Sequence, residues 1–331
     1  MPLHPVVEGI RKFRMATGFT PLYTMSVEEA RKADSETEAE IWEWIKQPEE
    51  IFDLDIEGPV GPLTLRVYRP QKECDEPLPV LVYFFGGGFV VGSLDTSEAI
   101  CRALAAMVPC VVVSVGYRLA PEHPFPAATE DCYAAVQWVA ENASRFGADG
   151  ERIAVAGDSN GGTLAAAISL MARDADGPRI SAQVLIYPAM HHGSATDSMR
   201  DNKDPMFFNG HSVPWFWNLY LADPADGASP YASPLNATDH SGLPAALMIT
   251  AEFCPLRDEG EAYANILSAA NVPVEYRRYE DLPHGFMSMA AVLDKAREAL
   301  DEIVAFLRRR LTVADMEETV STADRSNDSH A

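Results

Sequence analysis

From Ile51 onward, the chain alternates between short apolar, β-rich runs and longer helical stretches, and this alternation most limits the folds open to it. The runs Pro79–Phe85 and Cys110–Val115 consist almost entirely of β-branched, aromatic and other apolar residues. Such continuous runs are typical of central strands that are covered on both faces. Strands that alternate with helices predict an α/β fold built on a mostly parallel, doubly wound central sheet.

The remaining expected elements repeat the same rhythm. Further strands are expected at Leu63–Arg69, Arg152–Ala156, Ala182–Tyr187, Ala245–Thr250 and Val274–Tyr279. Helices are expected at Thr96–Met107, Ala127–Arg145, Gly161–Arg173, Arg257–Ala270 and Ala290–Arg310.

Two segments break the alternation, and they divide the chain into parts. Residues 1–50 have a mainly helical pattern, and residues 190–242 are rich in Pro, Asp, Asn and aromatic residues. A long excursion between two strands of a sheet is usually functional, often a lid over a site. The α/β core is therefore expected over residues 51–189 and 243–311. Residues 312–331 are polar and charged, which predicts a disordered tail.

Composition excludes several classes of protein. The formal net charge of −23 repels phosphate backbones, so no nucleic-acid partner is expected. The five cysteines are odd in number and irregularly spaced, which predicts neither a disulfide framework nor a zinc site. No run approaches the roughly 20 apolar residues of a membrane span. The expected location is the cytoplasm.

The strongest chemical motif is Gly157-Asp158-Ser159-Asn160-Gly161, between an apolar strand and a helix-forming run. This context is the one that a nucleophile elbow requires. Such a turn is sharp, so the residues two before and two after the serine must be very small. It lifts the hydroxyl of Ser159 to the C-terminal edge of the sheet. It also directs the backbone N–H of Asn160 toward a developing oxyanion.

A second motif, Phe85-Gly86-Gly87-Gly88, follows another expected strand. Glycines at a strand end allow the backbone to curl inward with free N–H groups. The N–H groups of Gly86 and Gly87 are therefore predicted to join that of Asn160 in an oxyanion hole.

The expected general base is His284, which lies in a loop just after the last strand. In enzymes with a nucleophile elbow, the catalytic residues follow one another along the chain in the order serine, acid, histidine. Of the eight histidines, His284 is the one in a strand-end loop late in the chain. His191 and His192 are adjacent, so their side chains diverge, and no metal site is predicted there.

The acidic residue that should orient His284 is not found at its expected position. It should follow the strand that begins at Ala245, where the expected turn carries Cys254. A thiol is a weak hydrogen-bond partner and cannot orient an imidazole as a carboxylate does. Two carboxylates remain as alternatives. Glu252 lies two residues earlier on an extended chain, and Asp258 lies about one helical turn later.

Together these motifs give the chain a resemblance to the bacterial hormone-sensitive lipase family of carboxylesterases. The resemblance rests on the elbow Gly157–Gly162, the glycine loop, the run Tyr117–Glu122, the segment Pro255–Gly260 and the triplet His284–Phe286. It implies an α/β-hydrolase core with a helical cap formed by the two irregular segments. It also implies hydrolysis of small-molecule esters with short to medium acyl chains, without a cofactor, and it leaves a homodimer open.

Three positions depart from the family pattern. Phe85 stands where the family usually has His, Gly116 where it has Asp, and Cys254 where it has the acidic Asp. The first two follow neighbouring strands, which suggests a polar pair lost as a unit. The departures leave two alternatives open: a non-catalytic protein that binds a small ligand on a hydrolase scaffold, and an enzyme of the same fold that acts on amides.

Overall fold

The structure is a computed structural model that describes residues 2–36, 47–70 and 76–311. The tail expected at residues 312–331 lies outside the described residues. So do Trp42, Trp44 and Cys74.

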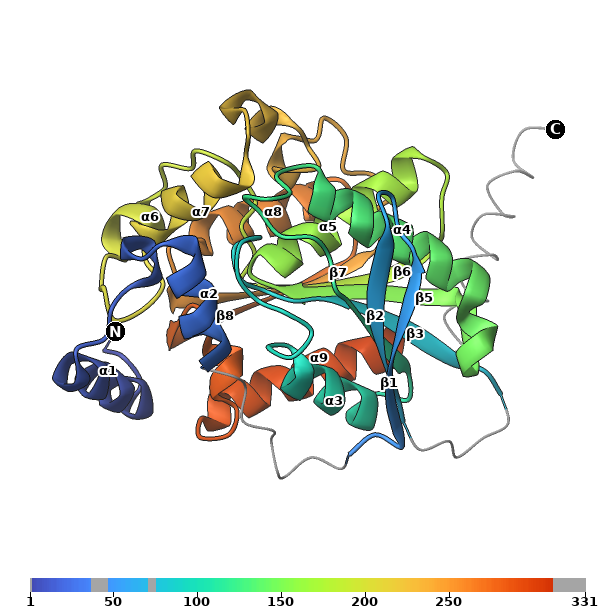
Figure 1. Cartoon of the computed structure of the whole chain (residues 1–331), viewed down its shortest axis with the longest axis horizontal. Coiled ribbons are helices and arrows are strands. Elements are labelled where there is room, and N and C mark those ends of the chain that lie inside the picture. Colours follow the sequence, from blue (N-terminus) through green and yellow to red (C-terminus); the bar gives the residue numbers. More distant parts are fainter. Residues whose placement is uncertain (1, 37–46, 71–75, 312–331) are drawn as a thin grey trace.

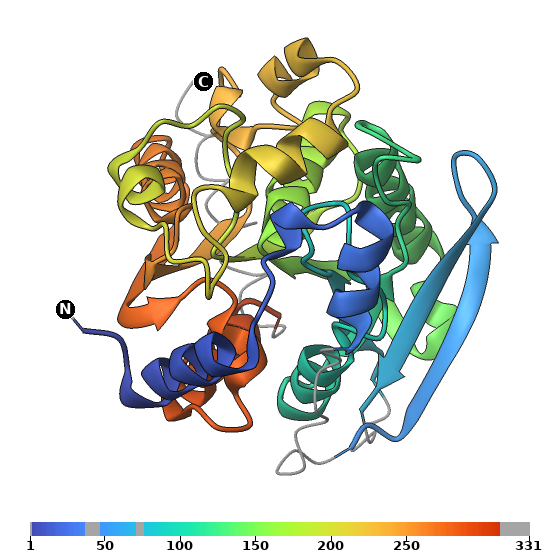
Figure 2. The same ribbon diagram turned by 60° about the vertical axis from the view of Figure 1, so that its left-hand side comes forward.

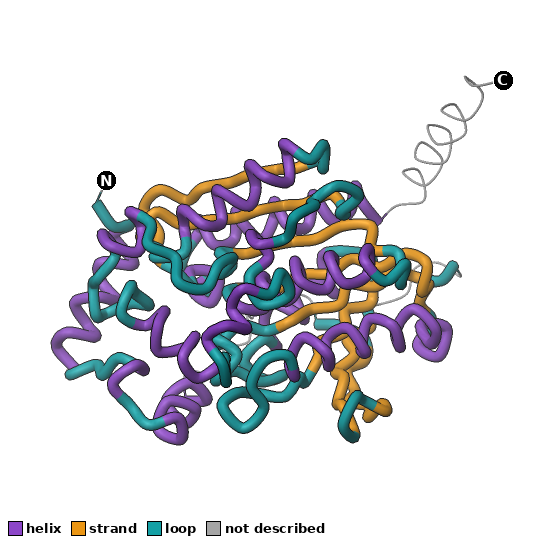
Figure 3. Tube along the Cα trace, turned by 90° about the horizontal axis from the view of Figure 1, so that it is seen from above, coloured by secondary structure: helices purple, strands orange, loops and turns teal. Residues whose placement is uncertain are grey.

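Within these residues, eight strands form one sheet in the order β1-β2-β4-β3-β5-β6-β7-β8. The first two junctions, β1 with β2 and β2 with β4, are antiparallel, and every later junction is parallel. Figure 3 shows the strands changing direction progressively across the sheet, as right-handed strand twist requires. The strands are β1 (Glu50–Glu57), β2 (Pro62–Arg69), β3 (Leu78–Phe84), β4 (Val111–Val115), β5 (Ala148–Asp158), β6 (Ile180–Ile186), β7 (Ala245–Phe253) and β8 (Val274–Pro283).

Helices cover both faces of this sheet (Figure 1). Helices α3 (Glu98–Met107) and α9 (Asp294–Leu311) pack on one face. The opposite face is covered by α4 (Ala127–Asn142), α5 (Asn160–Asp174) and α8 (Arg257–Ala269). The prediction of a mostly parallel, doubly wound sheet is confirmed. The strands between the layers are buried, and every residue of β4 is inaccessible to solvent.

Strand β1 is not predicted by the sequence pattern. Its sequence alternates acidic and apolar side chains, and acidic residues are depleted in strands. It forms nonetheless, because it pairs with β2 at the exposed edge of the sheet. There Asp53 binds Arg66, and Asp55 accepts a hydrogen bond from Thr64.

The two irregular segments carry the helices that lie outside the sandwich. The N-terminal segment forms α1 (Pro5–Thr17), η1 (Leu22–Thr24) and α2 (Val27–Glu36). Figure 2 shows α2 and η1 in front of the sheet, next to α7. The proposed cap boundaries stay a prediction. The remaining helices are η2 (Ala143–Phe146), α6 (Asp197–Asp201), α7 (Ser212–Tyr220), η3 (Pro224–Ala228), η4 (Pro234–Asn236) and η5 (Phe286–Met289).

The junction between β5 and α5 is very closely packed. A methyl group added at Gly161 would overlap the carbonyl oxygen of Phe84, and one at Gly157 would overlap the backbone of Gly161. Both obstacles are backbone atoms, which cannot rotate away as side chains do. The first turn of α5 therefore lies directly against the ends of β3 and β5.

We expect Gly161→Ala to lower the free energy of unfolding by about 1–3 kcal/mol, the usual cost of overpacking a core. Gly9→Ala is a matched control, because Gly9 lies on exposed α1 with no atom near the position of a new methyl group. That control should stabilise the chain by about 0.5–1 kcal/mol. Urea denaturation measures both, and equal stability of Gly161→Ala and the parent chain would contradict the close packing.

Candidate active site

Ser159 lies on the turn that joins β5 to α5. Its backbone has φ 55° and ψ −125°, a conformation that a residue with a side chain rarely adopts. The neighbouring strand holds the turn, since Ser159 N–H donates to the carbonyl of Ile186 at 2.8 Å. Such strained backbone costs about 1–3 kcal/mol and persists where the surroundings fix it. The turn raises the hydroxyl above the end of the sheet, as the motif predicts.

His284 comes from the loop after β8, 125 residues further along the chain. Its Nε2 lies 3.0 Å from Ser159 Oγ, which is hydrogen-bond distance. Two aromatic rings contact the imidazole. The ring of Phe208, from the 190–242 segment, stacks on it at 4.3 Å, and that of Tyr187 lies at 4.7 Å. This apolar burial lowers the pKa of His284 to about 3, so the ring is neutral at physiological pH.

Cys254 is the residue that the structure places on the far side of the imidazole. Its Sγ lies 3.2 Å from His284 Nδ1, and the N–H of Leu256 donates to the same sulfur at 3.4 Å. The thiol is fully buried, and burial raises its pKa far above the ordinary value. Cys254 therefore occupies the acid position as a neutral thiol.

A neutral thiol cannot enforce the tautomer of His284 that a general base needs. A thiol has one S–H donor, and sulfur is a weak acceptor. When that S–H donates to Nδ1, the ring hydrogen lies on Nε2 and points at Ser159 Oγ. A general base needs the opposite tautomer, with a bare Nε2 facing the hydroxyl. A carboxylate enforces that tautomer by accepting from Nδ1–H, whereas the thiol disfavours it.

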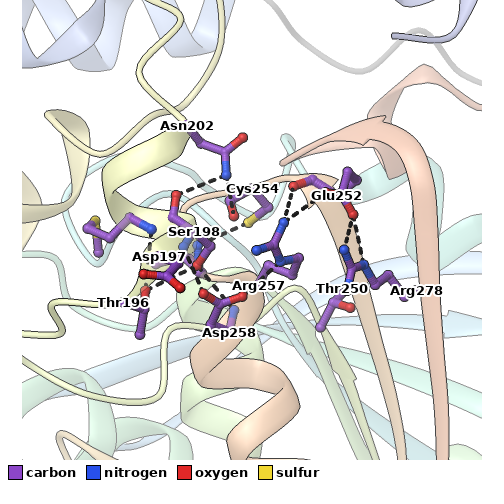
Figure 4. Close-up of polar contacts among 12 residues, drawn as sticks. Thr196, Asp197, Ser198, Asn202, Thr250, Glu252, Cys254, Arg257, Asp258 and Arg278 are labelled. Atoms are coloured by element: carbon purple, nitrogen blue, oxygen red, sulfur yellow. Dashed lines mark hydrogen bonds and ion pairs between the residues drawn. The ribbon is translucent and has the colours of Figure 1, made fainter. Parts of the chain in front are cut away.

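Neither alternative carboxylate is among the hydrogen-bond partners of the His284 ring, which are Cys254 and Ser159 within the described residues. Glu252 pairs with Arg257 at 2.9 Å and also with Arg278 (Figure 4). Asp258 accepts the N–H of Ser198 at 2.7 Å and pairs with Arg257 at 2.8 Å. These arginines, and the amide of Ser198, hold both carboxylates away from the imidazole. The prediction that either one could orient His284 therefore does not fit the structure.

The glycine loop after β3 lies beside the elbow, but one of its expected roles is wrong. The N–H of Gly86 donates to Asp158 Oδ1 at 3.1 Å, and the hydroxyl of Tyr83 donates to the same oxygen at 2.7 Å. The Gly86 amide is thus already engaged and cannot also bind an oxyanion. Burial raises the pKa of Asp158, and its two hydrogen bonds oppose that rise.

The amides beyond Gly86 are better placed. Gly87 has φ 123° and Gly88 φ 61°, both in the left-handed region that favours glycine. Among the described residues, no acceptor is found for either amide. Gly88 lines the same cavity as Ser159 and Asn160. Asn160 is the first residue of α5, where an N–H has no intrahelical partner. No role is predicted for Gly88 from the sequence, although the triple-glycine run contains it.

The side chain of Asn160 braces the loop from below. Its Nδ2 donates to the hydroxyl of Tyr117 at 3.1 Å, and that hydroxyl donates to the carbonyl of Phe85 at 2.8 Å. The ring of Phe85 stacks on Tyr117 with centroids 4.2 Å apart. Phe85 and Asn160 are thus joined through Tyr117 into one packed unit beneath the loop.

A further buried carboxylate, missed by the sequence analysis, supports the region behind Cys254. Glu259, on α8, accepts the N–H groups of Met190 and His191 at 2.8 and 2.7 Å. Burial raises its pKa to about 8. It fixes the start of the 190–242 segment against α8. The sequence feature that could have indicated this role is the position of Glu259 in the Pro255–Gly260 motif, on the buried face of α8.

A narrow apolar cavity opens at Ser159. Its walls come from the elbow, the glycine loop and the 190–242 segment, so segments far apart in the chain meet there. The lining residues are Gly88, Phe89, Ser159, Asn160, Ala189, Phe208, Val213, Phe216, Trp217 and Leu256. The described part of the chain contains no cluster of three metal-ligating side chains. The arrangement is suited to acyl transfer to a serine.

Comparison with known proteins agrees with this geometry. A family model described as the α/β-hydrolase fold matches residues 81–288. The chain belongs to this family. The relatives of this chain within the family are hormone-sensitive-lipase-like enzymes named esterases and carboxylesterases. By family, the chain is therefore a serine carboxylesterase.

Three relatives illustrate the similarity. Esterase LipI of Mycobacterium tuberculosis is 44% identical over 261 residues, 78% of this chain and 81% of the relative. The ethyl acetate hydrolase of Pseudomonas putida is 36% identical over 90% of this chain and 95% of its own. The hyperthermophilic esterase of Pyrobaculum calidifontis superposes with a TM-score of 0.88 at 43% identity, covering 93% of this chain and 99% of that structure. Among the described helices, none has the length and apolar character needed to cross a membrane.

We expect Cys254→Asp to raise kcat/KM for p-nitrophenyl butanoate by about 10²-fold to 10⁴-fold, because a carboxylate restores the productive tautomer of His284. Cys254→Asn is the matched control, with the same size and no charge, and should give no such gain. Steady-state kinetics measure both.

Variants of the two other carboxylates complete this test. Glu252→Gln and Asp258→Asn should leave the rate of the parent chain within about threefold, because neither side chain bonds to His284. A large loss in either variant, or an equal gain from Asn and Asp at position 254, would contradict the assignment.

Proposed function

We propose that the chain hydrolyses carboxylic esters with short to medium acyl chains through an acyl-enzyme on Ser159, with His284 as general base. The observation that carries the proposal is the 3.0 Å contact between His284 Nε2 and Ser159 Oγ at the floor of an apolar cavity. A nucleophile and a base within hydrogen-bond reach are the signature of covalent catalysis.

In the first step, Ser159 Oγ attacks the ester carbonyl carbon while Nε2 of His284 takes the hydroxyl proton. The tetrahedral intermediate then collapses, the bond to the alcohol oxygen breaks, and His284 gives its proton to the departing alkoxide. Water repeats the sequence on the acyl-enzyme, releasing the carboxylic acid and restoring Ser159.

The negative charge of the intermediate needs fixed donors. We assign these to the N–H groups of Gly87, Gly88 and Asn160. Gly88 thus takes the place of Gly86, which the sequence motif had predicted. The support is the left-handed backbone of the two glycines and the position of Asn160 at the start of α5. One such donor typically contributes about 10²-fold to 10³-fold in kcat.

Cys254 slows the steps in which His284 accepts and donates a proton. The buried imidazole must become a cation during both steps, and a thiol offers that cation no negative charge. The oxyanion donors still act without a carboxylate, so residual hydrolysis is expected to exceed the uncatalysed rate. The proposal is therefore a working but impaired esterase.

Substrate size follows from the cavity. The cavity at Ser159 is narrow, because the aromatic side chains of Phe216 and Trp217 from α7 line it. A methyl group at Gly88 would overlap the ring of Phe216, so this ring lies directly on the loop. The ethyl acetate hydrolase relative acts, by name, on a two-carbon acyl group, which supports short acyl chains here.

The second candidate function is ligand binding without turnover. The neutral thiol at the acid position favours it, because a binding protein needs no oriented base. The close contact between Ser159 and His284 opposes it, since binding alone requires neither residue.

A cytoplasmic location stays a proposal. It is supported by the four cysteines in the described part of the chain, Cys101, Cys110, Cys132 and Cys254, which are all buried and unpaired. The homodimer also stays a prediction.

The function is tested by hydrolysis of p-nitrophenyl butanoate and by labelling with a fluorophosphonate. We expect slow release of p-nitrophenol and a mass increase of one phosphonyl group, both lost in Ser159→Ala. Labelling depends on an activated hydroxyl at Ser159. Hydrolysis that persists in Ser159→Ala would remove the assignment, and silence in both assays, also with Cys254→Asp, would favour ligand binding.

The pH dependence gives an independent test. His284 acts as a base only when neutral, and burial lowers its pKa to about 3, so it stays neutral from about pH 4 upward. We therefore expect kcat/KM of the parent chain to show no acid limb between about pH 5 and 8. In Cys254→Asp the carboxylate favours the imidazolium, so the pKa rises and an acid limb should appear nearer the ordinary histidine value of about 6.5. The same acid limb in both proteins would contradict this account.

A further inference from the structure

Helix α2 of the N-terminal segment contacts the glycine loop on the side away from the sheet. We propose that α2, through Arg31 and Asp34, is a positioning element that holds residues 86–92 in the conformation that binds the oxyanion. This inference rests on the proposed function, because it concerns the donors assigned there. Figure 2 shows α2 beside the segments that follow β3.

Arg31 joins two segments of the core at once. Its Nε donates to the carbonyl of Val90 at 2.9 Å, and its Nη2 donates to the carbonyl of Ala120 at 2.8 Å. Both terminal nitrogens also bind the carboxylate of Glu122 at 2.7 Å. A guanidinium has donors in a rigid fork, so one side chain can fix several acceptors together.

The two segments that Arg31 joins are also bonded to each other. The N–H of Ala120 donates to the carbonyl of Phe89 at 2.9 Å. Arg31 therefore closes a small network around Phe89 and Val90, directly after the last proposed oxyanion donor, Gly88.

Asp34 holds the far end of the same loop, one helical turn after Arg31. Its Oδ2 accepts the N–H of Gly92 at 3.0 Å. The carboxylate is mostly buried, and burial raises its pKa. A carboxylate that keeps this position despite the cost of burial is positioned by the contact between α2 and the core.

The loop needs such external support because its own backbone is unusual. Gly87, Gly88, Phe89 and Gly92 all have positive φ, and Phe89 adopts φ 65° without being a glycine. Local bonds are few: the N–H groups of Val90 and Val91 both donate to the carbonyl of Gly87. Oxyanion donors contribute most when they are fixed before the reaction, so motion of the loop would reduce their effect.

The attachment of the loop is therefore two-sided. On the side of the sheet, Asp158 binds the amide of Gly86, and Tyr117 binds the carbonyl of Phe85. On the outer side, Arg31 and Asp34 bind Val90 and Gly92. Gly87 and Gly88 lie between the two attachments, so loss of the outer one frees one end of the donor segment.

A helix that merely covers the cavity predicts a different result. A cover contributes to substrate binding, and its loss would raise KM and leave kcat unchanged. A positioning element acts on the transition state, so its loss lowers kcat with little change in KM. Hydrogen exchange at residues 86–92 reports loop motion without any need for catalysis.

The experiment compares variants of α2 in the full-length chain and again with Cys254→Asp, which is expected to supply a larger rate. We expect Arg31→Met and Asp34→Ala to lower kcat for p-nitrophenyl butanoate by about tenfold or more, a fraction of the effect of losing one oxyanion donor. KM should stay within about threefold, and exchange at residues 86–92 should accelerate. Asp34→Asn keeps an acceptor for Gly92 and should retain more activity than Asp34→Ala.

Lys32→Met is the matched control. Lys32 lies on the same helix, is largely exposed, and pairs with Glu36 at 3.9 Å. It should change neither kcat nor loop exchange. If Arg31→Met does not fold, Arg31→Lys gives the same comparison, because it keeps the charge and lacks the fork.

The outcomes separate this inference from the proposed function. If neither the parent chain nor Cys254→Asp hydrolyses the ester, the proposed function fails, and hydrogen exchange alone then tests the role of α2. Unchanged exchange at residues 86–92 in both Arg31→Met and Asp34→Ala would overturn the inference. A raised KM with unchanged kcat would also overturn it, because α2 would then be a cover.

Discussion

The contact of α5 with the ends of β3 and β5 governs the geometry of the whole site. The helix can approach so closely only because Gly161 has no side chain, and this approach forces Ser159 into its strained turn. The same contact sets the first amide of α5 beside the glycine loop. Parallel strand order then brings the loops after β7 and β8 to the same edge. The turn at Ser159 and the first amide of α5 thus depend on one packing constraint, and strand order brings His284 to them.

The two halves of the site differ in how firmly they are held. The oxyanion half is bonded from several directions, through Asp158, Tyr117 and helix α2. The base half has a thiol where an orienting charge is usual, and aromatic contacts with Phe208 and Tyr187 hold the ring instead. Stacking fixes the plane of an imidazole but does not determine which nitrogen carries the proton. The position of the imidazole is therefore kept, whereas the thiol supplies no charge that would fix its tautomer.

Much of the fold and site was readable from the sequence because it depends on local patterns. Continuous β-branched runs predicted the central strands, and the small residues around Ser159 predicted the elbow. Strand β1 was missed because its pairing with β2, through Asp53 and Arg66, overrides a poor local propensity. The engagement of Gly86 with Asp158, and that of Glu252 with arginines, depends on contacts between distant segments. The spacing of residues in the sequence does not show which of several nearby groups forms a given hydrogen bond or ion pair.

The departures from the family pattern can be understood together through these contacts. Tyr83 pairs with Ser114, so Phe85 and Gly116, each two residues further on, lie at the same level of adjacent strands. Phe85 stacks on Tyr117, which in turn bonds to Asn160, so an apolar and amide-linked unit supports the loop from below. Because this unit keeps the loop attached, the changes at positions 85 and 116 need not impair the oxyanion donors. The impairment that we propose is then concentrated at Cys254, where one carboxylate would supply both the missing charge and the tautomer of His284.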